Sequence, residues 1–258
     1  MKRHIRLILP IITKVDGFVD GVAEFENDDF KIDAVNIDIG PSSVENEIDE
    51  ALAATGVILK AIEAENEGVD AVIIDSCGDA GIFPAREAVS IPVLGAGQTS
   101  MHVASMLGGR FSIVTVLDSV VGLFEDLAKK YGVYDHLASI RWIDIPVLDI
   151  HKNLGAVKQK LAEESLRAIE EDGANGIVLG CTGFIGCAAF IEKLLKSKGY
   201  DVPVVDPTTT CLVISQGLIK LNLSHSKKMY PTPATNKPVI GFNLPLFEPP
   251  VQKLKAVK

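Results

Sequence analysis

Short apolar runs alternate with longer segments of helical period along most of the chain. The runs are rich in Val and Ile, which is typical of strands that are covered on both faces. We expect eight such strands, at Ile5–Pro10, Ile32–Ile39, Asp70–Asp75, Ile91–Leu94, Phe111–Val116, Ile140–Pro146, Ile177–Gly180 and Val202–Val205. Strand followed by helix, repeated in this way, predicts an α/β fold with parallel sheets and helices on both faces.

The segments between the runs predict helices that stop at a glycine. We expect four of them at about 42–67, 119–131, 156–171 and 184–198, followed by Gly68, Gly132, Gly173 and Gly199. In the first, Ser42 and Glu45 resemble a capping box. The apolar positions near one face of that helix are Val44, Ile48, Leu52, Leu59 and Ile62. In GAGQTS, which lacks the third glycine of a dinucleotide loop, Thr99 is expected to cap a further helix.

An internal repeat indicates two similar halves. IPVLGAGQTSMHVAS, residues 91–105, aligns with VPVVDPTTTCLVISQ, residues 202–216, and each copy follows a strand that ends in cysteine. GRFSIVTV after the first copy resembles HIRLILPI at the chain start. We therefore predict two pseudosymmetric Rossmann-like or flavodoxin-like halves with a cleft between them. The expected divisions are 1–97 plus 207–221, then 98–206, and a C-terminal arm at 222–258.

The arm is predicted from its prolines, because six of the thirteen in the chain fall between Tyr230 and Pro250. Proline at this density blocks both helix and central strand, so an extended segment is expected. Its apolar side chains include Phe242, Leu244, Leu246 and Phe247. We expect the arm to pack on its own domain or on a neighbouring subunit; solvated disorder is the alternative.

Composition narrows the partner to a small molecule. The 258 residues are 47% hydrophobic and carry a formal net charge of −9 without a Lys/Arg cluster, which argues against nucleic acid or an anionic membrane. No apolar stretch reaches the roughly 18 residues of a membrane span. The first apolar run is broken by Pro10 and is expected to be a strand, not a signal peptide, in a cytoplasmic protein.

Cysteine and histidine spacing indicates neither disulfides nor a metal site. The four cysteines show no C-x-x-C pair. The histidines have no metal-ligand spacing and are expected at surface or helix positions; they are His4, His102, His136, His151 and His225. Cys187 and Cys211 lie beside apolar neighbours in expected helices, so we assign them to core packing.

Cys77 in VIIDSCGDAG and Cys181 in GIVLGCTGF end equivalent strands of the two halves. A lone cysteine after a strand is more often a buried small residue, but the repeat and its flanking residues favour function here. Open α/β sheets bind ligands beyond the carboxyl ends of their strands, so the two thiols are expected to face each other across the cleft. Nearby backbone N–H groups are expected to lower their pKa values and leave them accessible. Two opposed thiols suit a racemase, in which one removes a proton and the other donates to the opposite face.

The chain resembles the Asp/Glu/hydantoin racemase superfamily, and within it the hydantoin and allantoin racemase branch. The matching segments are IGPSSVENEIDEAL at 39–52, DSCGDAGIFPAREAVSIPVLG at 75–95, SIVTV at 112–116, VLGCTG at 178–183 and VPVVDP at 202–207. These segments follow the expected order over most of residues 5–221. Two cysteine blocks at this separation, together with G-P-x-S-x-E, are more specific than either block alone.

The resemblance implies that Cys77 and Cys181 are the two acid/base residues, one for each enantiomer. Around them it implies substrate-binding positions at Pro10, Ser43, Gly78, Asp79, Thr115, Gly180 and Thr182. It also implies no metal or pyridoxal phosphate, and a homo-oligomer. The chain departs from the family at LPIIT, residues 9–13, where an Asn-Pro-Asn segment keeps only its proline. The second block lacks the histidine of amino-acid racemases, which weighs against glutamate or aspartate as substrate.

Two other functions stay open on these residues. One is an isomerase or decarboxylase of the same fold that acts on a small carboxylic acid through an enolate. Decarboxylases of the superfamily need a single cysteine, so the presence of both favours racemisation. The other is a ligand-binding protein without catalysis, for which unreactive thiols with ordinary pKa values are expected.

Overall fold

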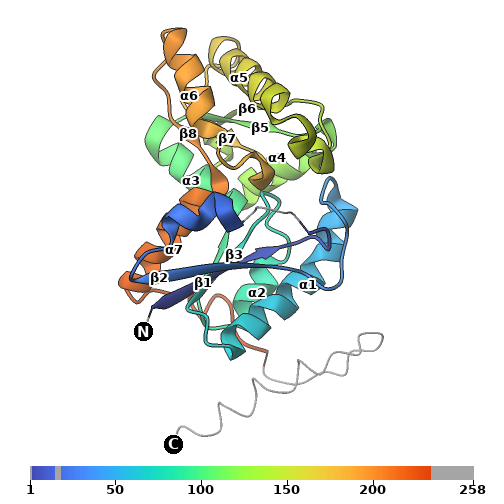
Figure 1. Ribbon diagram of the computed structural model, residues 1–258, viewed down its shortest axis with the longest axis vertical. Helices are drawn as coiled ribbons and strands as arrows, with labels where there is room; N and C mark the ends of the chain where they lie inside the picture. The colour runs from blue at the N-terminus through green and yellow to red at the C-terminus, as the bar shows by residue number, and fades with distance from the viewer. Residues whose placement is uncertain (1, 15–18, 234–258) are drawn as a thin grey trace, which may run out of the picture.

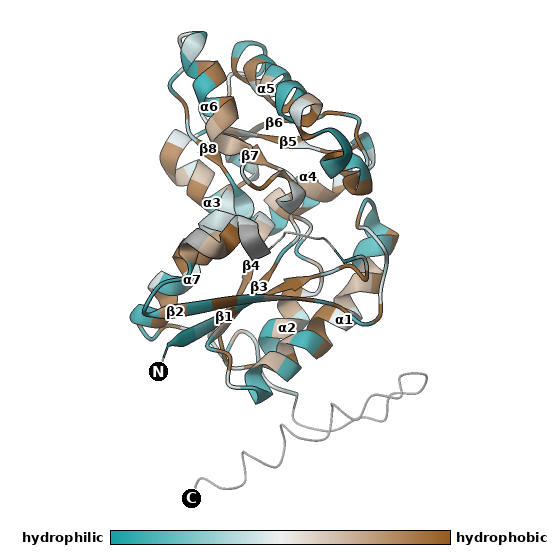
Figure 2. Cartoon of the chain, in the orientation of Figure 1, coloured by the Kyte–Doolittle hydropathy of each residue, from teal (hydrophilic) through white to brown (hydrophobic). Residues whose placement is uncertain are grey.

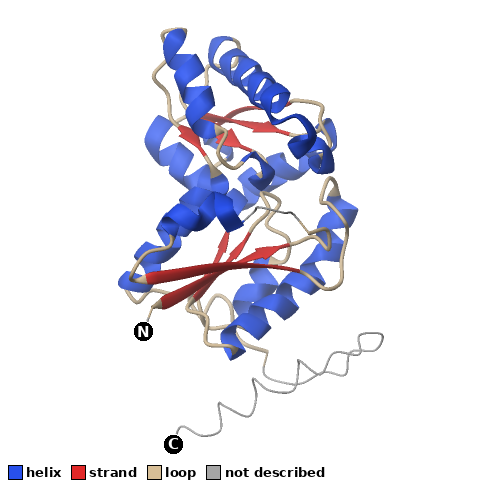
Figure 3. Ribbon diagram, viewed as in Figure 1, coloured by secondary structure: helices blue, strands red, loops and turns tan. Residues whose placement is uncertain are grey.

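Two four-stranded parallel sheets form the framework of the computed structural model, which describes residues 2–14 and 19–233 (Figures 1 and 3). The first sheet has the order β2-β1-β3-β4, with strands β1 (Arg3–Leu9), β2 (Phe30–Asn36), β3 (Ala71–Ile74) and β4 (Val93–Gly95). The second has the order β6-β5-β7-β8, with strands β5 (Phe111–Thr115), β6 (Leu137–Trp142), β7 (Ile177–Leu179) and β8 (Val204–Val205). All eight expected strands are confirmed, and the shared order confirms two similar halves.

Seven α-helices cover the sheets within the described residues: α1 (Glu47–Asn66), α2 (Ile82–Ala88), α3 (Ala96–Gly108), α4 (Val121–Lys130), α5 (Leu154–Glu170), α6 (Ala188–Ser197) and α7 (Pro207–Lys220). Short 3-10 helices add η1 (Val19–Phe25), η2 (Asp118–Val120), η3 (Tyr134–His136), η4 (Val147–Asn153) and η5 (Thr182–Phe184). The four glycines expected after helices all have the left-handed φ of a helix end, at Gly68 (81°), Gly132 (73°), Gly173 (71°) and Gly199 (91°). None of the helices described is long and apolar enough to cross a membrane.

Helix α1 begins at a later residue than the sequence predicts, and the buried side of its first half differs from the predicted one. Asn46, not Ser42, caps it, with the Asn46 side chain accepting a hydrogen bond from the Asp49 amide. Ile48 and Leu52 are 72% and 57% exposed, whereas Leu59 and Ile62 are buried, so the predicted apolar face is wrong for the first half of the helix and right for the second. In the first half the buried face carries small residues such as Ala53 and Gly56. Position 56 admits only glycine, because a Cβ there would lie 2.5 Å from the Ile39 carbonyl oxygen. Figure 2 shows that hydrophobic and hydrophilic residues alternate along this helix.

Helix α3 is capped by a residue that is remote in sequence. It starts at Ala96 directly after β4, so Thr99 lies inside it and the predicted cap is wrong. The Asp79 carboxylate takes that role, accepting hydrogen bonds from the amides of Gly97 (2.9 Å) and Gln98 (2.7 Å). Because Asp79 and α3 meet only in the folded chain, local sequence did not show this cap.

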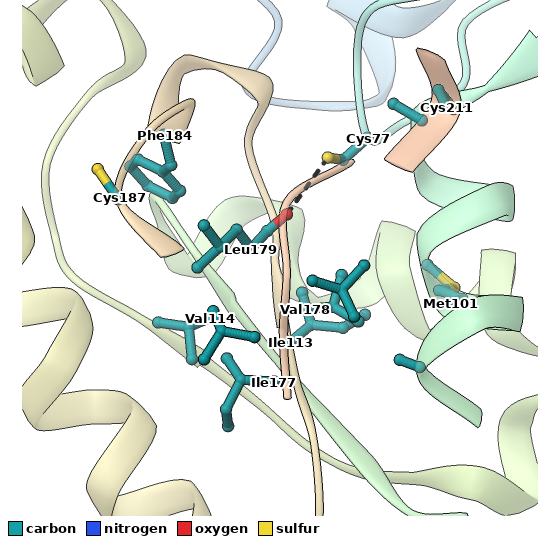
Figure 4. Close-up of a cluster of buried hydrophobic side chains, with 14 of the residues drawn as sticks. Cys77, Met101, Ile113, Val114, Ile177, Val178, Leu179, Phe184, Cys187 and Cys211 are labelled. Carbon is teal, nitrogen blue, oxygen red and sulfur yellow. Dashed lines mark hydrogen bonds between the residues drawn. The ribbon is translucent and has the colours of Figure 1, made fainter. Parts of the chain in front are cut away.

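Helices α3 and α7 pack against each other where the halves meet (Figure 1). Helix α3 carries the chain from β4 to β5, and α7 follows β8. The larger of two hydrophobic clusters runs through both halves, whereas the smaller lies between the first sheet, α1 and α2. Buried residues of the larger cluster from β5, β7, η5 and α3 are drawn in Figure 4. The division at 1–97 plus 207–221 and 98–206 stays a prediction.

The described part of the predicted arm runs along the first half. Lys227 Nζ donates to the carbonyls of Arg86 (2.8 Å) and Glu87 (3.2 Å) at the end of α2. The His225 ring accepts a hydrogen bond from the Val93 amide at 2.9 Å. Burial and the nearby Arg86 charge lower the pKa of His225 to about 4, so the ring is neutral at pH 7 and can accept this bond. Residues 234–258, which hold Phe242, Leu244, Leu246 and Phe247, lie outside the described residues.

Candidate active site

One cavity of about 490 Å³ lies between the halves at the carboxyl ends of the central strands. Its wall includes Cys77, which follows β3, and Cys181, which follows β7. These strands hold the same position in their sheets, so the cysteines enter the cavity from equivalent places in the two halves. Much of the rest of the wall is apolar, with Leu9, Ile11, Val120, Phe124, Leu148 and Ile185. The predicted juxtaposition of the two cysteines at one cleft is therefore seen.

The Cys77 thiol is buried and joins the two halves. It is 4% exposed, and its Sγ donates a hydrogen bond to the Leu179 carbonyl at 3.6 Å (Figure 4). Burial, and next the charge that Cys181 would carry, raise the pKa of Cys77 well above its ordinary value. The expectation of an accessible thiol with a lowered pKa is wrong for this residue.

Cys181 is partly exposed but is also held as a thiol. Burial raises its pKa to about 12, while the Gly183 amide N–H lowers it by bonding to the sulfur. The nearest regular helix after Cys77 begins only at Ile82, and Cys181 precedes a single 3-10 turn. Few helix-end N–H groups therefore reach either sulfur, and they do not outweigh burial and the neighbouring carboxyls. The predicted lowering of both thiol pKa values is thus contradicted.

A buried carboxyl, Asp75, directly follows β3 and lies near the second cysteine. It is 4% exposed, lines the cavity and accepts a hydrogen bond from the Thr208 hydroxyl at 2.7 Å. Burial raises the pKa of Asp75 to about 7, with Asp206 adding like charge. The Thr182 hydroxyl donates to the Asp75 backbone carbonyl at 3.2 Å, which ties the second cysteine loop to the first.

Most of the other predicted site residues line the cavity: Pro10, Gly78, Thr115, Gly180 and Thr182. Thr115 is fully buried and donates its hydroxyl to the Gly180 carbonyl at 3.1 Å. A Cβ at position 180 would lie 2.7 Å from the Thr115 Cβ, so glycine is needed for this approach. Ser43 and Asp79 lie outside the lining. Asp79 caps α3 and accepts from the Tyr131 hydroxyl at 2.7 Å.

Six polar residues of the wall were not among the predicted site residues, namely Thr13, Lys14, Glu50, Asp75, Ser76 and His151. Glu50 is 8% exposed and stands on the buried face of α1, at helical spacing from Ala53 and Val57. A glutamate at helical spacing from small buried residues could have been found in the sequence, but only once the buried face of α1 is known. His151 lies in η4, where no motif pointed to it.

The remaining cysteines have the structural role that was expected. Cys187 and Cys211 are fully buried, and neither lines the cavity. Cys211 donates to the Gly95 carbonyl at 3.4 Å, and Cys187 lies beside Phe184 in Figure 4. Within residues 2–14 and 19–233, no three His, Cys, Asp or Glu side chains gather to hold a metal ion.

Comparison with known proteins decides the family. The Asp/Glu/Hydantoin racemase family matches residues 15–213. The chain belongs to this family. A hydantoin racemase of Pseudomonas sp. (strain NS671) is 39% identical over 206 residues, 80% of this chain and 81% of that protein. A hydantoin racemase of Rhizobium meliloti is 35% identical over 187 residues, 72% of this chain and 76% of that protein.

A solved structure supports the same relationship. The allantoin racemase from Klebsiella pneumoniae superposes with a TM-score of 0.87 at 31% identity, covering 96% of this chain and all of that one. The chain is thus an isomerase of the racemase type, with the two-domain fold of its family. The resemblance drawn from the two cysteine blocks is confirmed.

Proposed function

We propose that this protein is a cofactor-independent racemase of hydantoin-type rings, either 5-substituted hydantoins or allantoin, with Cys77 and Cys181 as its two bases. The observation that carries the proposal is that both cysteines, from equivalent strand ends, line a single cavity. The relatives named hydantoin racemase and allantoin racemase support the substrate class.

The reaction needs one thiolate and one thiol. The thiolate takes the proton from the ring Cα, so that a C–H bond breaks, an S–H bond forms and an enolate results. The opposite thiol then gives its proton to the other face, and the charge has moved from one sulfur to the other. Because a charge on Cys181 raises the pKa of Cys77, a state with one thiolate is favoured over a state with two.

The wall of the cavity favours an uncharged substrate. Lys14 is the only lysine or arginine among the described lining residues, while Glu50 and Asp75 are both acidic. A carboxylate substrate such as glutamate needs cationic partners or several directed donors. A neutral ureide ring instead suits the apolar wall and needs only hydrogen bonds.

Deuterium exchange tests the proposal. The protein is incubated in deuterium oxide with single enantiomers of 5-substituted hydantoins and of allantoin, while loss of the Cα–H signal and optical rotation are followed against an enzyme-free blank. We expect both to change together. Cys77→Ala and Cys181→Ala should each lose racemisation by at least about 100-fold, because removing a general acid or base costs about that much.

The two single variants also discriminate the mechanism. Each should retain exchange only for the enantiomer that its remaining thiol faces, so the two variants should prefer opposite enantiomers. Cys187→Ala is the matched control, since this thiol is buried away from the cavity, and it should keep both activities. Racemisation that survives in either Cys77→Ala or Cys181→Ala would contradict the two-base proposal.

A further inference from the structure

Glu50 places a carboxyl group directly beside the first cysteine loop. It lies in the first turn of α1, is 8% exposed and contributes to the cavity wall together with Cys77 and Gly78. A Cβ at position 78 would lie only 1.6 Å from Glu50 Oε1, so the carboxyl rests on the backbone of Gly78. Glycine at this position keeps the space that the carboxyl fills.

No structural role accounts for this buried acid. Among the buried side-chain atoms described, only Glu50 Oε1 and His4 Nε2 lack a hydrogen-bond partner, and His4 lies 2.9 Å from the Asp33 carboxylate. The neighbouring buried acids are satisfied, since Asp75 accepts from Thr208 and Asp79 from backbone amides. An unmade hydrogen bond of a buried group costs about 1–3 kcal/mol, and such a group in a cavity wall calls for a ligand.

Burial, and next the charges around Glu50, keep its carboxyl protonated at neutral pH. Burial raises the pKa of Glu50 to about 8, and the carboxylates of Asp79, Glu47 and Asp49 raise it further in that order. Tyr131, at the end of α4, lines the same groove as Glu50 and donates its hydroxyl to Asp79. Asp126 and Lys130 of α4 share with Glu50 the groove that adjoins the cavity. A protonated carboxyl offers one O–H donor and one carbonyl acceptor side by side.

We propose that Glu50 binds the substrate by pairing with the amide edge of a neutral cyclic ureide. Its O–H donates to a ring carbonyl, and its other oxygen accepts from the adjacent ring N–H. A five-membered ureide holds N–H and C=O on the same edge, because its ring amide is cis, so both bonds form at once. This inference rests on the proposed function, and it makes Glu50 the residue that selects a ureide ring over a carboxylate.

Kinetics of Glu50 variants test the assignment. Glu50→Gln keeps one donor and one acceptor in the same shape, so its KM for 5-methylhydantoin should stay within about threefold of wild type at pH 7. Glu50→Leu removes both groups, and its KM should rise at least tenfold, as expected for the loss of about 1.4 kcal/mol. Thermal unfolding serves as the folding check, because an apolar residue in place of a buried, unpaired acid should not destabilise the protein.

The pH dependence of KM separates binding from a structural effect. Between pH 6 and 8.5 the wild-type KM should rise as the Glu50 carboxyl loses its proton and its donor. In Glu50→Gln the part of this rise that belongs to Glu50 should vanish, because an amide does not titrate in this range. The pH dependence that remains should be that of Asp75, which also lines the cavity and whose pKa burial raises to about 7. Glu63→Gln is the matched control on the same helix, since residue 63 lies outside the cavity wall and is not among the charges that raise the Glu50 pKa, and its KM at pH 7 should equal that of wild type.

Substrates methylated at either ring nitrogen in turn identify the paired edge. The methyl group that blocks the paired edge should weaken binding to wild type. It should leave binding to Glu50→Leu unchanged, because that variant has already lost the interaction that the methyl group removes. If wild type racemises hydantoins and Glu50→Leu keeps the same KM, the role of Glu50 is overturned and the racemase proposal stands. If wild type racemises none of them, both are overturned.

Discussion

At the scale of single residues, the two cysteines are held as thiols and not as preformed thiolates. Burial raises both pKa values, and each sulfur lies near acids that add to the effect. Both cysteines could be predicted from sequence, because their motifs are local and repeated. Their protonation could not, since it depends on Asp75 and on burial that only the folded cavity creates.

The raised thiol pKa values predict that kcat for racemisation increases with pH. Below the pKa, the fraction of thiolate grows about tenfold for each pH unit, so kcat should rise at least tenfold between pH 6.5 and 8.5. The measurement is kcat for a 5-substituted hydantoin at saturating concentration, corrected for the spontaneous rate at each pH. A flat profile over this range would mean that a thiolate already exists at pH 6.5, contrary to the effect of burial.

At the scale of elements, the strands could be predicted well, and the orientation and caps of the helices less well. Runs of buried Val and Ile mark strands regardless of context, which is why all eight were found. The predicted face of α1 was wrong in its first half, because small residues are buried there while Ile48 and Leu52 are exposed, although the predicted Leu59 and Ile62 are buried. The N-cap of α3 was predicted wrongly because the capping side chain, Asp79, comes from the loop that contains Cys77.

The cap of α3 predicts that Asp79 acts through stability. Asp79→Asn keeps a residue that tolerates its φ of 57° but replaces one acceptor oxygen by an amide donor, so one of the donors on Gly97, Gln98 and Tyr131 loses its partner. We expect the free energy of unfolding in urea to fall by about 1–3 kcal/mol. KM should be nearly unchanged at pH 6, where Glu50 stays protonated with or without the Asp79 charge.

A matched control for Asp79→Asn exists on the equivalent helix of the other half. Asp206 caps α7 locally, accepting from the Thr209 amide at 3.1 Å. The other Asp206 oxygen accepts from the Gly186 amide at the longer distance of 3.3 Å. Asn is as good an N-cap as Asp and loses only this longer bond, so Asp206→Asn should cost less than Asp79→Asn, about 0.5–1 kcal/mol. If Asp79→Asn instead raised KM without loss of stability, Asp79 would have to contact the substrate, as its place in the family motif first implied.

At the scale of the whole molecule, the cavity depends on contacts between halves that lie far apart in sequence. The repeat made two halves and a cleft predictable. It gave no sign of the bonds that close the cleft, such as Cys77 to Leu179 and Thr182 to Asp75. These bonds join loops of different halves, so neither loop reveals its partner. Glu50 likewise became a candidate only when α1 was placed against the cysteine loop.

Glu45 forms a further bond across the cleft and predicts how closure affects activity. Its Oε1 accepts from the Val147 amide at 2.6 Å, and its backbone carbonyl accepts from the Ser119 hydroxyl at 2.8 Å. Val147 lines the cavity, as does Val44 beside Glu45. Glu45→Ala should therefore lower kcat/KM by about 10–100-fold, the equivalent of a hydrogen bond to a charged group. The melting temperature should change little, because Glu45 is only partly buried and lies at the edge of the fold.

Two variants separate this bond from a general loosening of the loop. Glu45→Gln keeps an oxygen that accepts from Val147, so its kcat/KM should stay within about fivefold of wild type. Ser119→Ala removes the neighbouring bond, which ends on the Glu45 backbone and is exposed, and should cost less than about threefold. Small-angle scattering of Glu45→Ala should show a larger radius of gyration than wild type if the halves part. Equal activity of Glu45→Ala and wild type would mean that the other contacts between the halves hold the cavity closed without this bond, among them helices α3 and α7 and the bonds of Cys77 to Leu179 and of Thr182 to Asp75.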